Sequence, residues 1–178
     1  MIFSVDPGGW LSWKGGRARC VLGRAGVCPA WEKREGDGKT PVGLWAIRGI
    51  LWRADRIDRP VTELPASPIR PGDGWCDDSS HRDYNRLVTL PHPARTETLN
   101  RDDSLYDIIG ILGYNDDPVV MGAGSAIFLH LARPDFSGTE GCVGLAAPDM
   151  MVVLAAALPG DALEIEFLKT LGAGANSL

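Results

Sequence analysis

One histidine and one cysteine stand 12 positions apart in the stretch FLHLARPDFSGTEGCVGL, residues 128–145. His130 closes an apolar run, and Cys142 directly follows Gly141. A thiol with an ordinary pKa of about 8.5 is only slightly ionised at neutral pH, but a neighbouring histidine can lower that pKa and activate the sulfur as a nucleophile. Gly141 would admit a substrate carbonyl, and backbone N–H groups at Gly141 and Cys142 would stabilise its oxyanion. The pair suggests acyl transfer, although two unrelated core residues would show the same spacing.

A metal site is not expected from the cysteine and histidine spacing. The chain has four cysteines and three histidines but no C-x-x-C pair, which structural zinc sites usually contain. A disulfide between Cys20 and Cys28 is conceivable, whereas small buried thiols are the simpler interpretation. The cysteines are Cys20, Cys28, Cys76 and Cys142.

The residues Gly38-Lys39-Thr40 suggest a phosphate-binding loop, but the surrounding sequence does not fit that motif. That motif needs a glycine five positions before Gly38, where Lys33 stands, and Pro41 follows where a helix should start. We therefore predict a glycine-rich turn that leads into a strand at Val42.

Length and composition fit one globular domain. The 178 residues are 44% hydrophobic and carry a net charge of -5, and no short segment concentrates the basic residues. A nucleic-acid-binding surface is therefore not expected. No run of about 18 apolar residues predicts a membrane span. Residues 1–16 contain Asp6 and a Pro-Gly-Gly turn, so we expect no secretory signal in this sequence.

The elements that must position His130 and Cys142 are mainly β-strands. Alternating runs and turn residues predict hairpins over 2–23 and strands over 43–53, 104–115, 125–131 and 162–168. In the strand 125–131, Ile127, Leu129 and Leu131 should share one face, with Phe128 and His130 on the other. Pro148 and Asp149 at the start and a Pro-Gly stop predict one helix within 147–160.

Residues 54–100 show no sustained periodicity and are rich in Pro, Asp, Ser and Arg. A structureless stretch of this length is unusual inside a compact domain, so we expect a functional wall or lid. Residues 171–178 should form a flexible tail. The expected organisation is one domain over 1–170 that carries the irregular insertion 54–100.

Two motifs resemble the signature of bacterial L,D-transpeptidases, the YkuD-type catalytic domain. In that family a histidine after an apolar strand precedes Ser/Thr-x-Gly-Cys-Val/Ile, which corresponds here to His130 and Thr139–Val143. Residues 36–43, GDGKTPVG, resemble an upstream family motif. The chain departs from the pattern at Gly144, where the family commonly has Arg, and at Glu140, where it often has His. The departures concern substrate-carboxylate contacts and linkage preference more than the chemistry.

The resemblance implies a mainly β, sandwich-like catalytic fold with one main helix after Cys142. It implies an enzyme of cell wall biogenesis and cell shape that crosslinks peptidoglycan stem peptides through a thioester on Cys142. His130 would move the protons, Gly141 would admit the carbonyl, and Thr139 would hold Cys142 in place. No metal or organic cofactor is implied, and carbapenem-type β-lactams would be covalent inhibitors.

The groups that orient His130 and contact substrate are less defined. A backbone carbonyl in the loop 133–138 or the carboxylate of Asp135 would orient the imidazole. Substrate contacts are expected from side chains near the motifs and in the insertion, each of which is also a common turn or core residue. These candidates are Tyr114, Asn115, Glu140, Gly144, Trp75 and Tyr84.

Two alternatives to transpeptidation stay open at this point. The same pair would serve an L,D-carboxypeptidase, endopeptidase or amidase, and a non-catalytic wall-binding module would use its Trp and Tyr residues to hold glycan or peptide. The substrate implies the periplasm or cell wall, so we expect an exported protein with a trimmed leader or another export route. The stem positions joined and the oligomeric state are not specified by the sequence.

Overall fold

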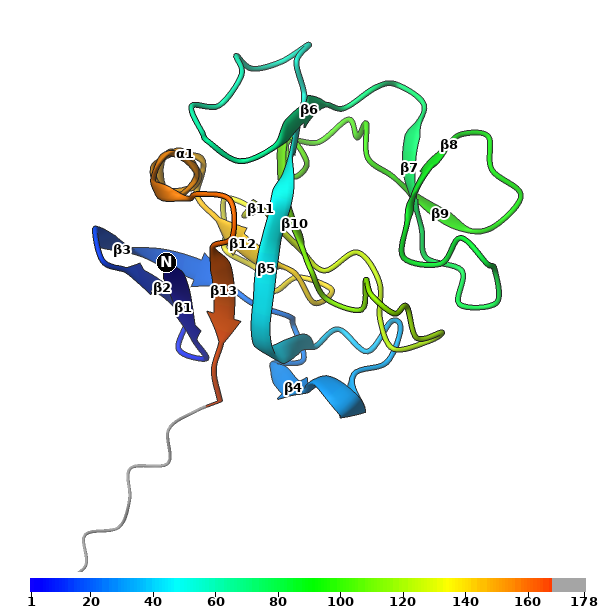
Figure 1. Ribbon diagram of the computed structural model, residues 1–178, viewed down its shortest axis with the longest axis horizontal. Helices are drawn as coiled ribbons and strands as arrows, with labels where there is room; N and C mark the ends of the chain where they lie inside the picture. Colours follow the sequence, from blue (N-terminus) through cyan, green and yellow to red (C-terminus); the bar gives the residue numbers. More distant parts are fainter. Residues whose placement is uncertain (168–178) are drawn as a thin grey trace, which may run out of the picture.

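The computed structural model describes residues 1–167, a mainly β domain with one α-helix (Figure 1). In chain order its strands are β1 (Ile2–Asp6), β2 (Trp10–Trp13), β3 (Gly16–Val21), β4 (Val27–Pro29), β5 (Thr40–Trp52), β6 (Ala66–Pro68), β7 (Asp73–Cys76), β8 (Leu87–Thr89), β9 (Thr96–Thr98), β10 (Ile108–Leu112), β11 (Phe128–Leu131), β12 (Val143–Leu145) and β13 (Ala162–Ile165). A 3-10 turn, η1 (Ala30–Glu32), follows β4, and the helix α1 (Ala147–Ala156) follows β12.

The long strand β5 closes the main sheet on itself. Its residues 43–46 pair with β13, and its residues 47–52 pair with β10, both antiparallel. The remaining pairs complete a ring in the order β10-β11-β12-β3-β2-β1-β13 and back to β5. The predicted mainly β fold with one main helix after Cys142 is confirmed, and its sheet has a closed, barrel-like form.

Strand β11 separates two hydrophobic clusters, because its side chains alternate between its faces. Ile127, Leu129 and Leu131 lie in the main cluster, together with the buried residues of β1, β13 and α1. Phe128 lies on the other face, in a cluster that also contains Cys142. The predicted alternation is therefore confirmed, and the nucleophile candidate is on the face of β11 that carries His130. All four cysteines are buried and free.

Helix α1 begins and ends where its sequence signals are. Pro148 occupies the first turn with Asp149, and the helix ends at Ala156, just before the Pro-Gly stop. Its buried residues Met150, Val153 and Leu154 pack into the main cluster. The part of the chain described here, residues 1–167, contains no helix long and apolar enough to cross a membrane.

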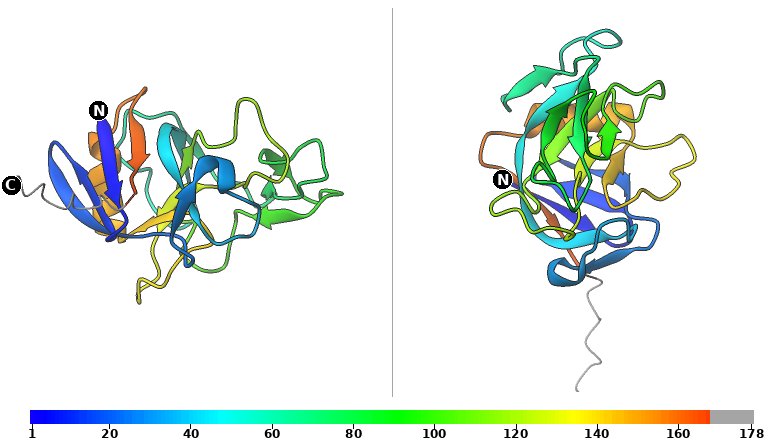
Figure 2. Two further views of the ribbon diagram at one scale, coloured as in Figure 1. Left: turned by 90° about the horizontal axis from the view of Figure 1, so that it is seen from below. Right: turned by 90° about the vertical axis from the view of Figure 1, so that its right-hand side faces the viewer.

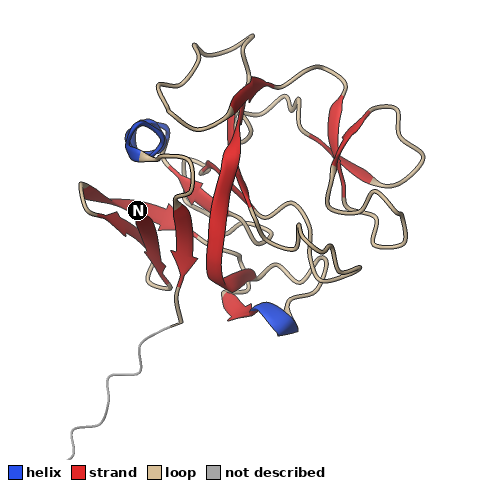
Figure 3. Cartoon of the chain, viewed as in Figure 1, coloured by secondary structure: helices blue, strands red, loops and turns tan. Residues whose placement is uncertain are grey.

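The insertion 54–100 has more regular structure than its sequence pattern indicates. Strands β7, β8 and β9 form a separate antiparallel sheet at the end of the molecule opposite β1–β3 (Figures 1 and 2), and β6 pairs with β5. Loops connect these elements (Figure 3). Strands of three or four residues are too short to show a period of two, which explains the missed sheet. A lid role for this segment stays a prediction, and the predicted tail 171–178 lies outside the described residues.

Candidate active site

Cys142 and His130 are brought to one cavity by adjacent parallel strands. β11 and β12 pair with His130 level with Gly144, and Cys142 immediately precedes β12. The thiol donates a 3.1 Å hydrogen bond to the carbonyl oxygen of Ala126, and the Phe128 N–H donates to Sγ at 3.3 Å. Both Cys142 and His130 line a cavity of about 670 Å³. The two residues predicted to react together therefore share one cleft.

The imidazole of His130 is oriented by the backbone. Nδ1 lies 2.8 Å from the carbonyl oxygen of Leu131, which can only accept, so Nδ1 carries the proton and Nε2 is the basic nitrogen. The ring of Tyr106 packs edge-on against the imidazole at a centroid distance of 5.5 Å. The sequence predicted that a carbonyl of the loop 133–138 would orient the imidazole. In the structure the Leu131 carbonyl does so. Asp135 is exposed and accepts the Ser137 N–H within its own loop.

Burial keeps both reactive groups neutral in the resting protein. Removal from water raises the pKa of the Cys142 thiol to about 12 and lowers the pKa of His130 to about 4. No hydrogen bond joins these two side chains within residues 1–167, so the resting cysteine lacks the lowered pKa that the sequence suggested. The thiolate must therefore form as the proton moves to Nε2 during the reaction.

Thr139 fixes the turn that carries the cysteine. Its hydroxyl donates a 2.7 Å hydrogen bond to the Cys142 carbonyl and accepts the Gly141 N–H at 3.1 Å. Thr139 is buried. Its backbone N–H donates to the Leu22 carbonyl, and its carbonyl accepts the Arg24 N–H, both in the segment after β3. The Gly141 N–H is consequently occupied, which leaves the Cys142 N–H as the candidate oxyanion donor in this turn.

The glycine-rich segment 36–43 packs directly against the cysteine turn. Gly141 has φ +136°, and a Cβ there would lie 2.8 Å from the Lys39 carbonyl oxygen. The Gly23 N–H donates to the Thr40 hydroxyl at 2.8 Å, and a Cβ at Gly23 would meet the Gly38 carbonyl oxygen at 2.4 Å. These glycines allow three backbone segments to approach one another. The strand β5 begins at Thr40, two residues before the predicted start.

The cleft has a mixed charge. Its acidic lining residues are Glu35, Asp77, Glu97 and Glu140, and its basic ones are Lys33, Arg95, Arg101 and Arg133. Most of these side chains are already paired, as in the 3.0 Å contact of Arg95 with Asp77. Arg133 is exposed and makes no ion pair with any residue in 1–167. It is therefore available to an anionic group of a ligand.

Several cleft residues were missed by sequence reasoning. Tyr106 is buried against His130 and donates a 2.8 Å hydrogen bond to the carboxylate of Glu97. Burial raises the pKa of Glu97, while the Tyr106 hydroxyl and Arg101 oppose that rise. Glu97 and Arg95 belong to the insertion, where neither spacing nor periodicity distinguishes them from loop residues.

The predicted substrate contacts beside the cysteine and in the insertion take different positions. Glu140 lines the cleft and makes a 2.7 Å ion pair with Arg24. Gly144 lies in β12, where a Cβ would meet Val21 at 2.8 Å, and it does not line the cleft. Trp75 is buried and does not line the cleft, and its ring lies 5.0 Å from that of Phe128. Tyr84 is buried and donates to Glu35, so it supports a lining residue.

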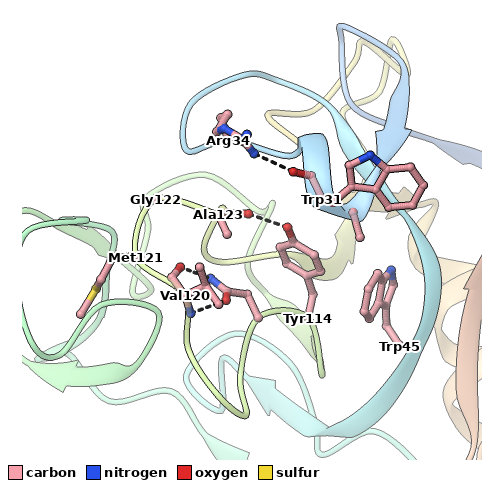
Figure 4. Close-up of a pocket in the computed structure, with 10 residues that line it drawn as sticks. Trp31, Arg34, Trp45, Tyr114, Val120, Met121, Gly122 and Ala123 are labelled. Atoms are coloured by element: carbon pink, nitrogen blue, oxygen red, sulfur yellow. Dashed lines mark hydrogen bonds between the residues drawn. The ribbon is translucent and has the colours of Figure 1, made fainter.

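Tyr114 and Asn115 line a second cavity instead, of about 590 Å³ (Figure 4). Trp31 and Trp45 form one side of it, and Tyr114 donates to the Ala123 carbonyl. The Asn115 side chain accepts the Val120 N–H at 2.7 Å and donates to two carbonyls of the same loop. The structure does not bring these two residues to Cys142, and their role as substrate contacts stays a prediction.

Comparisons with known proteins show the family of this chain. The family model of the L,D-transpeptidase catalytic domain, YkuD, matches residues 8–165. Among solved structures, an L,D-transpeptidase from Mycobacterium smegmatis is 10% identical with a TM-score of 0.43, over 93% of this chain and 58% of that chain. No curated protein matches this chain. Because the family model spans most of the sequence, including His130 and Cys142, the chain belongs to the YkuD family of L,D-transpeptidase catalytic domains, which are cysteine-dependent acyltransferases.

Proposed function

We propose that this protein is a peptidoglycan L,D-transpeptidase that crosslinks stem peptides through a thioester on Cys142. The observation that carries the proposal is the shared cleft of Cys142 and His130, in which the Leu131 carbonyl holds Nδ1–H and leaves Nε2 as the base. Membership of the YkuD family supports the same chemistry.

The first half-reaction would acylate the cysteine. His130 Nε2 takes the thiol proton as Sγ attacks the carbonyl carbon of an L-residue in the donor stem. The Cys142 N–H stabilises the resulting oxyanion. When the tetrahedral intermediate collapses, the C–N bond breaks, and the imidazolium returns its proton to the departing amine of the D-residue. A thioester and a neutral imidazole are left.

The second half-reaction would transfer the acyl group. His130 Nε2 removes a proton from the acceptor amine as that nitrogen attacks the thioester carbonyl. Collapse of the second intermediate breaks the C–S bond and returns the proton to sulfur. The products are a new amide crosslink and the original thiol, so no external oxidant or reductant is required.

The cleft has groups suited to a zwitterionic peptide. A stem peptide brings both carboxylates and amines, and the cavity presents four acidic and four basic side chains. Among the four basic residues that line the cleft, Arg133 is the one without an ion pair to residues 1–167, and we assign it to a substrate carboxylate. In this assignment Arg133 supplies a positive charge that the family commonly has as an arginine two positions after the cysteine, where this chain has Gly144.

The test is to incubate the protein with purified tetrapeptide muropeptides and to analyse the products by intact and tandem mass spectrometry. Crosslinked dimers should form with wild type and be absent with Cys142→Ala. A carbapenem should add its mass to wild type, with the adduct on Cys142. Shortened monomers alone would identify a carboxypeptidase. Unchanged products from Cys142→Ala would show that the reaction does not require this cysteine.

A wall-crosslinking enzyme works outside the cytoplasmic membrane, so we also propose a periplasmic or wall-associated location. Fractionation of the native organism with an antibody against this chain tests it. Recovery in the cytoplasmic fraction alone would contradict this location.

A further inference from the structure

Three potential metal ligands meet in the insertion, outside the catalytic cleft. One ligand atom from each of Cys76, His81 and His92 lies within 4.8 Å of the other two. Cys76 ends β7, His81 lies in the loop before β8, and His92 lies in the loop before β9. Cys76 is fully buried and its thiol is free, while the side chain of His81 is 28% exposed and that of His92 is 11% exposed. A thiolate with two imidazoles is a ligand set typical of Zn²⁺.

Asp83 lies beside both imidazoles and is the candidate for a fourth ligand. Its Oδ2 is 3.3 Å from His92 Nε2 and 3.5 Å from His81 Nδ1. Ligand atoms bound tetrahedrally to Zn²⁺ at about 2.0–2.1 Å are separated by roughly 3.3–3.4 Å. The carboxylate and His92 Nε2 therefore already have the spacing of neighbouring ligands in a tetrahedral site. His81 Nδ1 accepts the Asp83 backbone N–H at 3.2 Å, so Nε2 is the His81 nitrogen open to an ion.

The charges also suit a divalent cation. One thiolate and one carboxylate neutralise Zn²⁺, while the two imidazoles bind in their neutral form. Binding releases the Cys76 thiol proton to solvent. Asp77 and Asp78 are close enough to act electrostatically on the same sulfur, and they favour a cation beside it.

We propose that Cys76, His81, His92 and Asp83 bind a structural Zn²⁺ ion that fixes one wall of the catalytic cleft. The ion cross-links β7 to the loops on either side of β8, in a sheet whose strands have only three or four residues. Because all four ligands come from the protein, the site has no open position for substrate.

The ligands are directly connected to residues of the cleft. Asp77, next to Cys76, and Arg95, three residues after His92, both line the cavity and pair with each other. Asn85, two residues after Asp83, accepts the Ala126 N–H at 3.0 Å. The Ala126 carbonyl in turn accepts the Cys142 thiol. Zinc binding would thus restrain the segment that holds the nucleophile.

Measuring the metal content of the protein tests this proposal without an activity assay. Untagged protein is incubated with Zn²⁺, passed over a desalting column and analysed by inductively coupled plasma mass spectrometry. Wild type should retain one equivalent, and Cys76→Ser and His81→Ala/His92→Ala should each retain less than a tenth of that. The double variant truncates one partly exposed and one mostly buried side chain, and circular dichroism reports whether it is folded. Substitution with Co²⁺ should give the visible bands of a tetrahedral ion and a thiolate charge-transfer band, both absent from Cys76→Ser.

Two control variants separate this site from the other thiols. Cys28→Ser removes a buried cysteine outside the cluster, and Cys142→Ala removes the proposed nucleophile, so both should keep one equivalent of zinc. Zinc retained by Cys142→Ala, which is expected to be inactive, shows that the metal site and the proposed reaction are tested independently. Wild type that retains no stoichiometric zinc, or a folded double variant that retains as much as wild type, would overturn the proposal.

Discussion

The Nδ1–H of His130 donates a 2.8 Å hydrogen bond to the carbonyl oxygen of Leu131, its neighbour in β11. The acceptor is a backbone group, so the tautomer of the histidine is set by the conformation of the strand and not by a second polar side chain. Burial of the ring then keeps it neutral to low pH, because the protonated form would lose its hydration. The site therefore holds a base that is already deprotonated at neutral pH.

Removing the Thr139 hydroxyl should impair the reaction more than the fold. Thr139→Val loses the bonds to the Cys142 carbonyl and the Gly141 N–H and leaves both groups without that partner. We expect a loss of stability of about 1–3 kcal/mol and a fall in acylation rate of at least tenfold. Acylation kinetics with a carbapenem and urea unfolding measure the two effects. Thr139→Ser keeps the hydroxyl and should remain within a few-fold of wild type; equal losses in both variants would contradict the role of this group.

A methyl group at position 141 should displace the nucleophile. Gly141→Ala places a Cβ 2.8 Å from the Lys39 carbonyl oxygen at φ +136°, so one of the two backbone segments must move. We expect acylation to fall by about a hundredfold, since small misplacements of reacting groups have effects of this size. Gly160→Ala is the matched control, because φ is also positive there but nothing lies within 4 Å of the new Cβ. It should lose only about 1 kcal/mol of stability and keep full activity. A fully active Gly141→Ala protein would show that this close approach is dispensable.

The buried histidine should make the fold acid-sensitive. His130 titrates near pH 6.5 in the unfolded chain and at about 4 in the fold, so the unfolded state binds more protons between these values. Stability contributed by the neutral ring is therefore complete at pH 7 and is lost as the pH falls from about 6.5 to 4. Relative to His130→Gln, wild type should lose about 3 kcal/mol of unfolding free energy over this range. Urea titrations of both proteins at several pH values measure the difference, and parallel curves would exclude a lowered His130 pKa.

The free thiol should behave as an un-ionised cysteine. With its pKa raised to about 12 by burial, Cys142 should react with iodoacetamide about tenfold faster for each pH unit between about 7 and 9.5. Peptide mass spectrometry separates its alkylation from that of the other three cysteines. A rate that levels off below about pH 8 would instead indicate a resting thiolate paired with imidazolium.

Loss of Arg133 should weaken substrate binding more than it slows chemistry. A hydrogen bond to a charged group contributes about 1.5–3 kcal/mol, so Arg133→Ala should raise KM for a tetrapeptide donor by about ten- to a hundredfold with little change in kcat. Arg70→Ala, an exposed arginine outside the cleft lining, should leave both constants unchanged. An Arg133→Ala protein with wild-type KM would exclude this residue as the carboxylate contact.

The sequence was sufficient wherever local patterns determine structure. The alternation in 125–131 predicted which face of β11 carries His130, and the Pro148 and Pro-Gly signals predicted α1. Both depend on residues a few positions apart. The cysteine turn was also predictable in outline, since Thr139 does contact Cys142.

Features that depend on contacts between distant segments were not predictable in this way. The cleft joins Glu97 and Arg95 of the insertion to His130, and nothing in the spacing of these residues indicates that they meet. The sequence predicted a lowered thiol pKa because a histidine is close in the chain. In the structure, burial instead raises the pKa of the Cys142 thiol. The cluster of Cys76, His81 and His92 was missed because it contains a single cysteine and so lacks the C-x-x-C pair that most structural zinc sites contain.

Strand β1 pairs in parallel with β13, with Ile2 level with Ala162 and Val5 level with Ile165. The ring of strands thus joins the two ends of the described chain, and its closure requires contacts across almost the entire length of the domain. Such a topology has a high contact order, which slows folding. During synthesis, residue 165 must leave the ribosome before the ring of strands can close, so the barrel closes only after all the residues that line the cleft have been translated.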